Sequence, residues 1–220
     1  AVNKTGVLLL HGFDGDVGEI ESMRAYLERR GYVVSCPLLP GHGKTKKELA
    51  EATCEDWIDF VEQAYLGLSR ECGRVFAVGF SMGGLLAVNL WHYGFSGLVT
   101  VNMPIYYWNP KIIAANLLKD FRRYGKKYVD ASTGKPFAAL LEFQKLLTKT
   151  KPMLRYITCK TMVVQALDDD TVHYKSADYI LRRVRADRVV FRPPHGGHMI
   201  FQSESAQEVC RRIEAFLRVC

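Results

Sequence analysis

Three kinds of polar residue that together can carry out acyl transfer each follow an apolar run in this sequence. A serine, Ser81, stands in the pattern Gly-x-Ser-x-Gly at 79–83, three aspartates occupy 168–170, and His198 follows a glycine-rich loop. A serine hydroxyl is a weak nucleophile at neutral pH and needs a base within hydrogen-bond reach. A histidine base in turn needs an acceptor that fixes its tautomer. The three segments therefore suggest a catalytic triad, provided that the fold brings them together.

The pattern at 79–83 lies between a predicted strand and a predicted helix, which is the context of a nucleophile elbow. Residues 74–78 form a short apolar run, and apolar residues recur at helical spacing from Leu85 to Trp91. In such an elbow the serine occupies a sharp, strained turn. Glycines are expected at 79 and 83 because a Cβ at either position would crowd the turn and the neighbouring strand. The pattern alone recurs by chance, so the interpretation depends on this context.

The acid and the base each have competitors. Asp168, Asp169 and Asp170 are adjacent, and the residues alone leave the choice among them open. His195 lies in the same loop as His198 and competes with it as the base. The remaining histidines are interpreted as residues that orient or brace loops, or as packed or exposed helix-end residues: His11, His42, His92 and His173.

The apolar pattern predicts an α/β fold. Strands are expected at 5–10, 32–36, 74–78, 97–102, 161–166 and 189–191. Helices are expected at 20–30, at 53–69, after the elbow, at 175–185 and at 205–219, with Thr53 and Gly31 as caps. Strands that alternate with helices indicate a doubly wound, mainly parallel sheet. Ligands of such sheets bind beyond the carboxyl ends of the strands, where the serine, the aspartates and His198 are expected.

Residues 103–158 interrupt this alternation. Residues 1–102 and 159–220 are therefore assigned to the core, and 103–158 to a helical cap that lies over the strand ends. The insertion contains two or three short helical patterns and many basic residues. We expect its aromatic residues both to line an apolar pocket and to pack the cap on the body: Tyr106, Tyr107, Trp108, Phe121, Tyr124, Tyr128, Phe137 and Phe143.

Composition excludes several classes of protein. The hydrophobic share of 48% and the charged share of 24% are those of an ordinary globular chain, and no apolar run reaches the length of about 18 residues needed to span a membrane. The net charge of +7 is spread over helix-like segments without a nucleic-acid motif, which favours solvated helix faces. Residues 1–6 lead directly into the first predicted strand and do not have the pattern of a signal peptide. Its six scattered cysteines indicate free thiols in a reducing compartment, the cytoplasm.

The sequence resembles the α/β-hydrolase superfamily over its whole length and, more narrowly, the small-capped bacterial carboxylesterases and monoacylglycerol lipases. The narrower resemblance is carried by LHGF at 10–13, GHG at 41–43, GFSMGG at 79–84, VQA at 164–166 with Asp169, and Gly-His at 197–198. The chain order serine, aspartate, histidine is that of this superfamily. The resemblance implies Asp169 as the acid, three residues before the apolar Val172. It also implies His198 as the base, because a glycine directly precedes it.

The resemblance also implies the reaction. The backbone N–H groups of Phe13 and Met82 would form the oxyanion hole. The expected activity is hydrolysis of short-to-medium-chain acyl esters or monoacylglycerols through an acyl-enzyme, without metal or cofactor. A small-molecule ester is the expected partner, with neither nucleic acid nor a stable membrane anchor, and a homodimer is compatible with the sequence.

Two other functions use the same residues or the same fold. A thioesterase or amidase would employ an identical triad, because that triad serves all acyl transfers. A binding module on this fold would not need the triad at all. Such modules often lack a triad member, whereas every position is filled in this sequence, which favours an enzyme.

Overall fold

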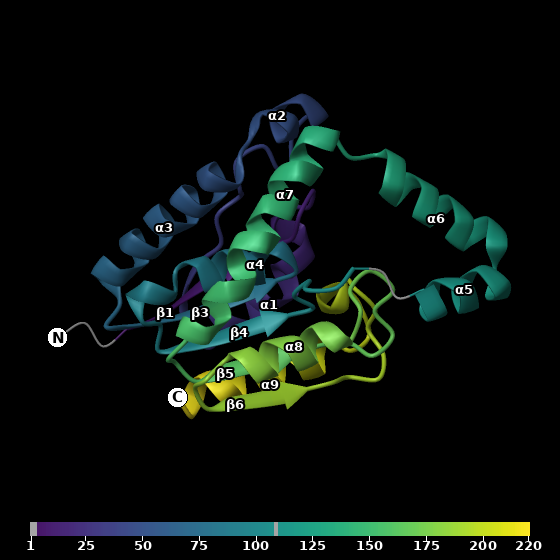
Figure 1. The fold of residues 1–220 in the computed structure, drawn as a ribbon. Helices are drawn as coiled ribbons and strands as arrows, with labels where there is room; N and C mark the ends of the chain where they lie inside the picture. The colour runs from purple at the N-terminus through teal and green to yellow at the C-terminus, as the bar shows by residue number, and fades with distance from the viewer. Residues whose placement is uncertain (1–3, 108–109) are drawn as a thin grey trace.

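A six-stranded parallel sheet forms the centre of the fold (Figure 1). This computed structural model describes residues 4–107 and 110–220, so Trp108 of the predicted cap and the first three residues lie outside the described residues. The strands run in the order β2-β1-β3-β4-β5-β6, and every neighbouring pair is parallel. Their bounds are β1 Thr5–Leu10, β2 Val33–Ser35, β3 Arg74–Phe80, β4 Gly97–Val101, β5 Thr161–Val164 and β6 Arg188–Phe191. The predicted α/β class and the positions of all six strands are confirmed.

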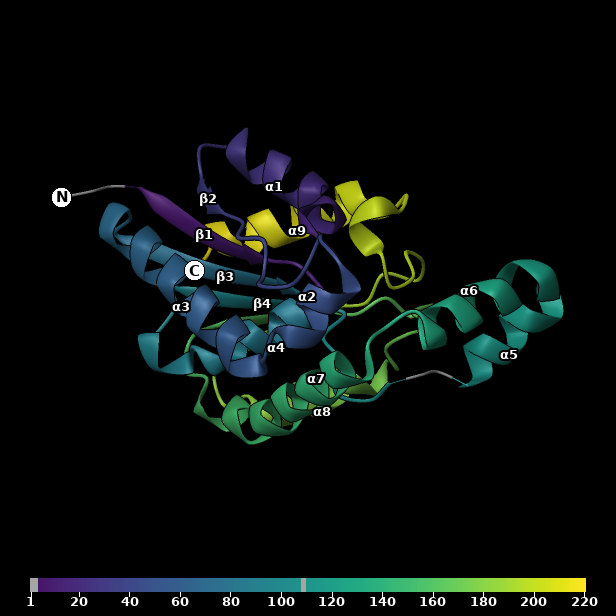
Figure 2. The same ribbon diagram turned by 90° about the horizontal axis from the view of Figure 1, so that it is seen from above.

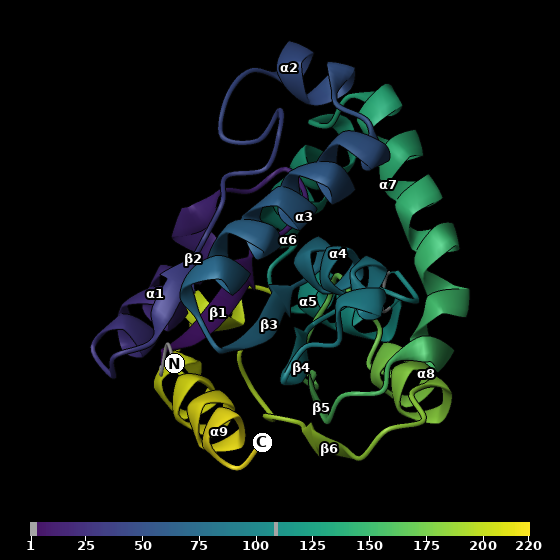
Figure 3. The ribbon, with the colours of Figure 1, turned by 90° about the vertical axis from the view of Figure 1, so that its left-hand side faces the viewer.

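Helices cover both faces of the sheet (Figure 3). Helices α1 and α9 lie on one face, and α3, α4, α7 and α8 lie on the other. Within the described part of the chain, none of the helices has the length and apolar character that a membrane span requires. The bounds are α1 Glu21–Glu28, α2 Lys46–Glu51, α3 Cys54–Glu71, α4 Met82–Asn89, α5 Pro110–Lys119, α6 Phe121–Thr133, α7 Phe137–Thr150, α8 Lys175–Arg183 and α9 Ala206–Arg218, with short 3₁₀ helices η1 Val17–Ile20, η2 Trp91–Tyr93, η3 Lys151–Tyr156 and η4 Ile200–Gln202.

The two faces of the sheet are buried in two separate hydrophobic clusters. Along β1, Leu8 and Leu10 belong to the cluster under α3 and α4, whereas Val7 and Leu9 belong to the cluster under α1 and α9. All four side chains are fully buried, and each stabilises the fold by about 1.5–3 kcal/mol. This double burial is the reason that the strands appear in the sequence as continuous apolar runs instead of alternating ones.

The sheet reverses its winding direction between β1 and β3. The chain passes from β1 outward to β2 and then returns to β3 on the other side of β1. Leu10 lies opposite Gly79 in the register of these two strands. At such a switch point the loops that leave the two strands diverge, which opens a crevice at their carboxyl ends. The segments 11–13 and 81–83 both leave the sheet at this point.

The insertion 103–158 has two differently packed halves. Helices α5 and α6 extend away from the sheet, and α7 returns across the body (Figure 2). On α7, Ala139, Phe143, Leu146 and Leu147 are buried in the same cluster as α3 and α4. In addition, the Asn89 amide on α4 donates a hydrogen bond of 2.7 Å to Thr150 Oγ1. The second half of the insertion is therefore part of the packing of the body.

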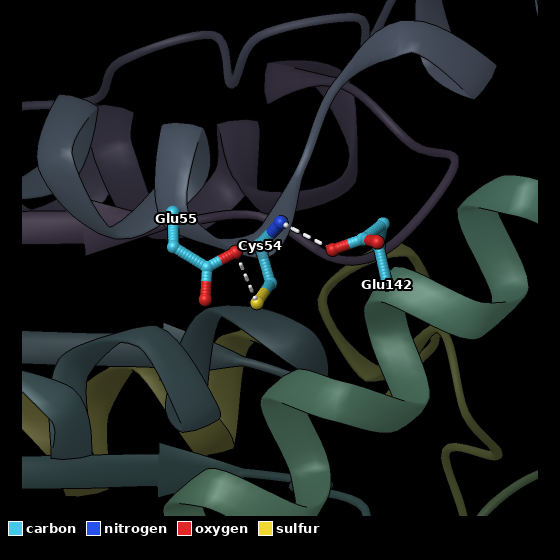
Figure 4. A group of neighbouring side chains, drawn as sticks. All are labelled: Cys54, Glu55 and Glu142. Atoms are coloured by element: carbon cyan, nitrogen blue, oxygen red, sulfur yellow. Dashed lines mark hydrogen bonds between the residues drawn. The ribbon is translucent and has the colours of Figure 1, made fainter.

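A carboxylate on α7 also ties that helix to the beginning of α3 (Figure 4). Glu142 Oε2 accepts a hydrogen bond of 3.1 Å from the Cys54 backbone N–H, and its other oxygen pairs with Lys145. The Cys54 thiol contacts Glu55 Oε2 at 3.1 Å. Among the described residues these three are the only group spaced to share a metal ion, but burial and the Glu55 contact raise the pKa of Cys54 to about 12. The thiol therefore stays protonated at neutral pH, which makes it a poor ligand.

Replacement of Glu142 by alanine is expected to lower the free energy of unfolding by about 1 kcal/mol. The variant loses an acceptor for an α3 N–H and a negative charge at the N-terminus of that helix. Urea denaturation of wild type, Glu142→Ala and Glu142→Gln measures the effect. Glu142→Gln keeps the acceptor oxygen and should lose less stability. Equal stabilities of all three proteins would contradict a capping role.

Candidate active site

Ser81 occupies the turn between β3 and α4 in a strained backbone conformation. Its φ is 50° and its ψ is −120°, a conformation that non-glycine residues rarely adopt and that costs about 1–3 kcal/mol. Its N–H donates a 2.8 Å hydrogen bond to Val101 O at the end of β4, which holds the turn against the sheet. The Ser81 side chain therefore points away from the sheet at the beginning of α4.

The glycines on either side make this turn sterically feasible. A Cβ at Gly79 would lie 2.4 Å from backbone atoms of Gly83, and a Cβ at Gly83 would lie 2.3 Å from Leu10 O. Real Cβ atoms are never this close to backbone atoms, and the backbone cannot move aside as a flexible side chain can. The crowding expected from the sequence is therefore present at both positions.

The histidine expected from the sequence lies between the serine and one of the aspartates. His198 Nε2 lies 3.1 Å from Ser81 Oγ, and His198 Nδ1 lies 2.9 Å from Asp169 Oδ2. The Asp169 side chain is fully buried, and the His198 side chain is 16% exposed. Asp169 Oδ1 accepts 2.8 Å hydrogen bonds from the Thr171 and Val172 N–H groups. These two bonds fix the carboxylate with its other oxygen directed at the imidazole.

The two neighbouring aspartates have different partners. Asp168 accepts hydrogen bonds from the N–H groups of Gly196 and Gly197, at 3.2 and 2.8 Å, and so holds the loop that carries His198. Asp170 accepts from Lys127 Nζ at 2.6 Å and from the Tyr128 hydroxyl at 2.9 Å, both on α6. Burial acts to raise the pKa of Asp170, but its hydrogen bonds and the Lys127 charge outweigh burial and lower it. Of the three aspartates, only Asp169 hydrogen-bonds to the His198 ring.

His195, the competing base, lies at the surface. Its side chain is 86% exposed, and its Nδ1 lies 3.8 Å from Asp168 Oδ2. It therefore faces the carboxylate that holds the loop, while His198 faces Ser81.

The loop after β1 is held on both sides of Gly12. The Gly12 N–H donates to Glu19 Oε2 at 2.9 Å, and Gly12 O lies 2.9 Å from His11 Nδ1. His11 Nε2 accepts from the Leu39 N–H at 3.1 Å, so the proton of the neutral ring is on Nδ1 and points at Gly12 O. A peptide group is planar and trans, so this bond also fixes the direction of the Phe13 N–H. Phe13 and Ser81 both line the cavity described below.

Burial shifts the pKa of two groups that hold this loop. Burial lowers the pKa of His11 to about 4, so the ring is neutral at pH 7. Burial also raises the pKa of Glu19, although the hydrogen bond from Gly12 opposes that shift. The side chains of His11 and Glu19 thus hold the loop by hydrogen bonds in a region that is largely shielded from solvent.

A cavity of about 690 Å³ opens above Ser81. Side chains from the core and from the insertion form its walls, including Phe13, Leu140 and Phe143. Its polar lining includes Glu19, Lys127 and Lys135, in addition to Ser81 and His198. The cavity therefore combines apolar side chains with ionic side chains from both the body and the insertion.

Comparison with known proteins shows to which family the chain belongs. A model of the alpha/beta hydrolase family matches residues 7–212. The chain belongs to the α/β hydrolase family. It is 30% identical to a thermostable monoacylglycerol lipase of Bacillus sp. (strain H-257), over 81% of this chain and 76% of that one, and 28% identical to a carboxylesterase of Bacillus subtilis (strain 168), over 96% and 91%. The fold is also that of a solved structure of the metagenome-derived lipolytic enzymes LipS and LipT, with a TM-score of 0.83, 23% identity and coverage of 100% and 96%.

Sequence reasoning missed one buried residue that organises the site of this α/β hydrolase. Asn102 follows β4 with a φ of 48° and is fully buried. Its amide donates to Gly197 O at 3.0 Å and to His198 O at 2.9 Å, while its Oδ1 accepts from the Ala166 N–H at 2.9 Å. A polar residue directly after an apolar strand, at the carboxyl edge of a parallel sheet, is the signal that could have identified it.

The neutral state of His11 predicts a pH-dependent contribution to stability. The pKa is about 4 in the folded protein and about 6.5 in the unfolded chain, so below pH 6.5 the unfolded chain binds the proton more strongly. Stability from this group is complete above pH 6.5 and is lost as the pH falls towards 4, by about 2–3 kcal/mol in total. Denaturation at pH 7, 6, 5 and 4 should show a shallower decline for His11→Gln than for wild type. His195→Gln, at an exposed position, is the control; a constant stability difference between wild type and His11→Gln would contradict the prediction.

Proposed function

We propose that this chain is a serine carboxylic-ester hydrolase. The observation that carries the proposal is the position of His198, whose two ring nitrogens lie 3.1 Å from Ser81 Oγ and 2.9 Å from Asp169 Oδ2. Nucleophile, base and acid are thus within hydrogen-bond reach of one another, which is the geometry that acyl transfer by a serine requires. The relatives named carboxylesterase and monoacylglycerol lipase support the same chemistry.

In the proposed reaction Ser81 Oγ attacks the ester carbonyl while His198 Nε2 takes the hydroxyl proton. His198 then returns this proton to the alcohol as the C–O bond breaks, which leaves an acyl group on Ser81. Water, deprotonated by His198, then attacks the acyl-enzyme, and His198 returns this proton to Ser81 Oγ as the acyl–oxygen bond breaks and the acid is released. Asp169 keeps the His198 proton on Nδ1 and stabilises the imidazolium. Every step uses side chains, backbone and water, without metal or cofactor.

The negative oxygen formed in each attack would lie between two backbone N–H groups, those of Met82 and Phe13. Met82 is the first residue of α4, so its N–H has no partner within the helix and lies at the positive end of the helix dipole. The orientation of the Phe13 N–H is set by the bond between His11 and Gly12 O. Removal of one such donor typically costs about 10²–10³-fold in rate.

We further propose that the substrates are short-to-medium-chain acyl esters or monoacylglycerols. A cavity of about 690 Å³ with the apolar side chains of Phe13, Leu140 and Phe143 suits one acyl chain and not a polymer. Residues 103–158 would act as the cap. Within it, α7 is fixed to the body, so α5 and α6 are the part that can open (Figure 1).

Two rival enzymatic activities, those of a thioesterase and an amidase, would use the same triad. They differ from an esterase in the leaving group, and the names of the relatives favour the ester. A binding module would need no base beside Ser81, yet His198 lies there. We also propose a cytoplasmic location, because free cysteines are typical of a reducing compartment and the cysteines in the described part of the chain are free.

Replacement of Ser81 by alanine is expected to lower kcat by about 10⁴-fold or more, since the nucleophile is lost while the fold is kept. Hydrolysis of p-nitrophenyl esters of increasing acyl length, compared between wild type and Ser81→Ala, measures this and finds the preferred chain length. Thioesters and amides of the preferred acyl group test the rival activities. Near-normal turnover by the variant would exclude Ser81 as the nucleophile.

Asp169→Asn is expected to lower kcat by about 10³- to 10⁴-fold, because the amide no longer stabilises the proton on His198 Nδ1. Asp170→Asn is the matched control, since its side chain contacts Lys127 and Tyr128 of the cap. We expect it to cost less than about 10-fold. Thermal denaturation of both variants separates catalytic from folding effects. If Asp170→Asn lowered kcat more than Asp169→Asn, the role of the catalytic acid would pass to Asp170.

A further inference from the structure

One cation in the wall of the cavity has no anionic partner nearby. Lys135 is half-buried and lines the same cavity as Ser81 and His198. Its Nζ lies 5.1 Å from the ring centroid of Phe13, the residue that carries the proposed oxyanion N–H. Within the described part of the chain, no carboxylate oxygen lies within 4.0 Å of this Nζ, since none of the ion pairs includes it. A half-buried lysine without an ion-pair partner in the protein is available to pair with the anionic group of a ligand in the cavity.

Two of the three carboxylates in or beside the cavity wall have other partners. Asp170 is paired with Lys127, the other lysine of the cavity wall. Glu19 accepts a hydrogen bond from the Gly12 N–H, and burial raises the pKa of its carboxyl group. The charge of Lys135 lowers this pKa only weakly. Asp14 lies exposed at the rim. Lys127 therefore has a permanent counter-ion in the protein, and Lys135 does not.

Lys135 adjoins the helix of the insertion that packs on the body. It directly precedes Pro136, the N-cap of α7. The same helix buries Ala139 and Phe143 in the core, and the Phe143 ring packs against Phe13 at 5.0 Å between centroids. The cation thus lies beside the proposed oxyanion loop, next to the part of the insertion that packs on the body.

We propose that Lys135 binds an anionic group carried by the ester itself, a carboxylate or a phosphate, and that the enzyme prefers such charged esters to neutral ones of the same length. The inference rests on the proposed ester hydrolysis and names a substrate class for that site. An ammonium group is a compact point charge that pairs with either anion. Charge-assisted hydrogen bonds are stronger than neutral ones, and partial burial reduces their screening by salt.

The test compares matched pairs of esters. On the acyl side, p-nitrophenyl monoesters of succinic, glutaric and adipic acid are compared with p-nitrophenyl butanoate, pentanoate and hexanoate. On the alcohol side, a monoacylglycerol is compared with the same compound phosphorylated on its free primary hydroxyl. The quantity measured is the ratio of kcat/KM for the charged ester to that for its neutral partner, in wild type, Lys135→Met, Lys135→Arg and Lys126→Met.

We expect the ratio to exceed one in wild type for at least one pair, and to fall about 10-fold in Lys135→Met, as for the loss of a partly buried charge-assisted contact. Lys135→Arg keeps the charge and should retain most of the ratio. Lys126, an exposed residue of α6 outside the cavity wall, is the control for the general field of the cap. The ratio should also decrease as salt is added. The pair that responds identifies the acyl or the alcohol portion as the charged one.

A ratio that is unchanged in Lys135→Met for every pair would overturn the inference. So would an equal loss for charged and neutral esters, because that result would assign Lys135 to the oxyanion or to the fold instead of to the substrate. The absence of any Ser81-dependent ester hydrolysis is a separate result, which would overturn the proposed function and this inference together.

Discussion

The strained turn at Ser81 is the constraint on which the rest of the site depends. A non-glycine residue at a φ of 50° persists only where its surroundings hold it there. Here the restraint comes from the bond to Val101 O and from the contact of Gly83 with Leu10 O, which leaves no room for a Cβ. The same contact brings the end of β1 against the elbow, so the loop that carries Phe13 and the turn that carries Ser81 are positioned by a single packing arrangement.

Local patterns in the sequence were sufficient to predict the sheet and to indicate which residues meet above it. The six strands are buried on both faces and therefore appear as apolar runs, and the order of the polar segments places them at one edge of a parallel sheet. The residues that connect those segments were not found. Asn102 bonds to Ala166 and to the loop at 197–198, residues far from it in the chain, and no local pattern encodes such contacts. Lys135, which lies near Phe13 in the fold but far from it in the chain, was missed for the same reason.

The insertion shows a second limit of sequence patterns. Apolar residues at helical spacing indicate that a helix has a buried face, but not what covers that face. The apolar face of α7 packs on the body, together with Asn89 and Thr150, whereas α5 and α6 extend beyond it (Figure 2). The helix α2 was also not predicted, although Thr45 and Glu48 form a capping box at its beginning.

Three consecutive side chains, Asp168, Asp169 and Asp170, hold the histidine loop, the imidazole and helix α6 respectively. Because the three side chains are chemically identical, the conformation of the backbone alone determines which partner each carboxylate contacts. Insertion or deletion of a single residue in this turn would leave an aspartate near each place but direct each carboxylate at the wrong partner. The length of this turn is therefore as important to the site as the identity of Asp169, because the length determines which of the three carboxylates faces the imidazole.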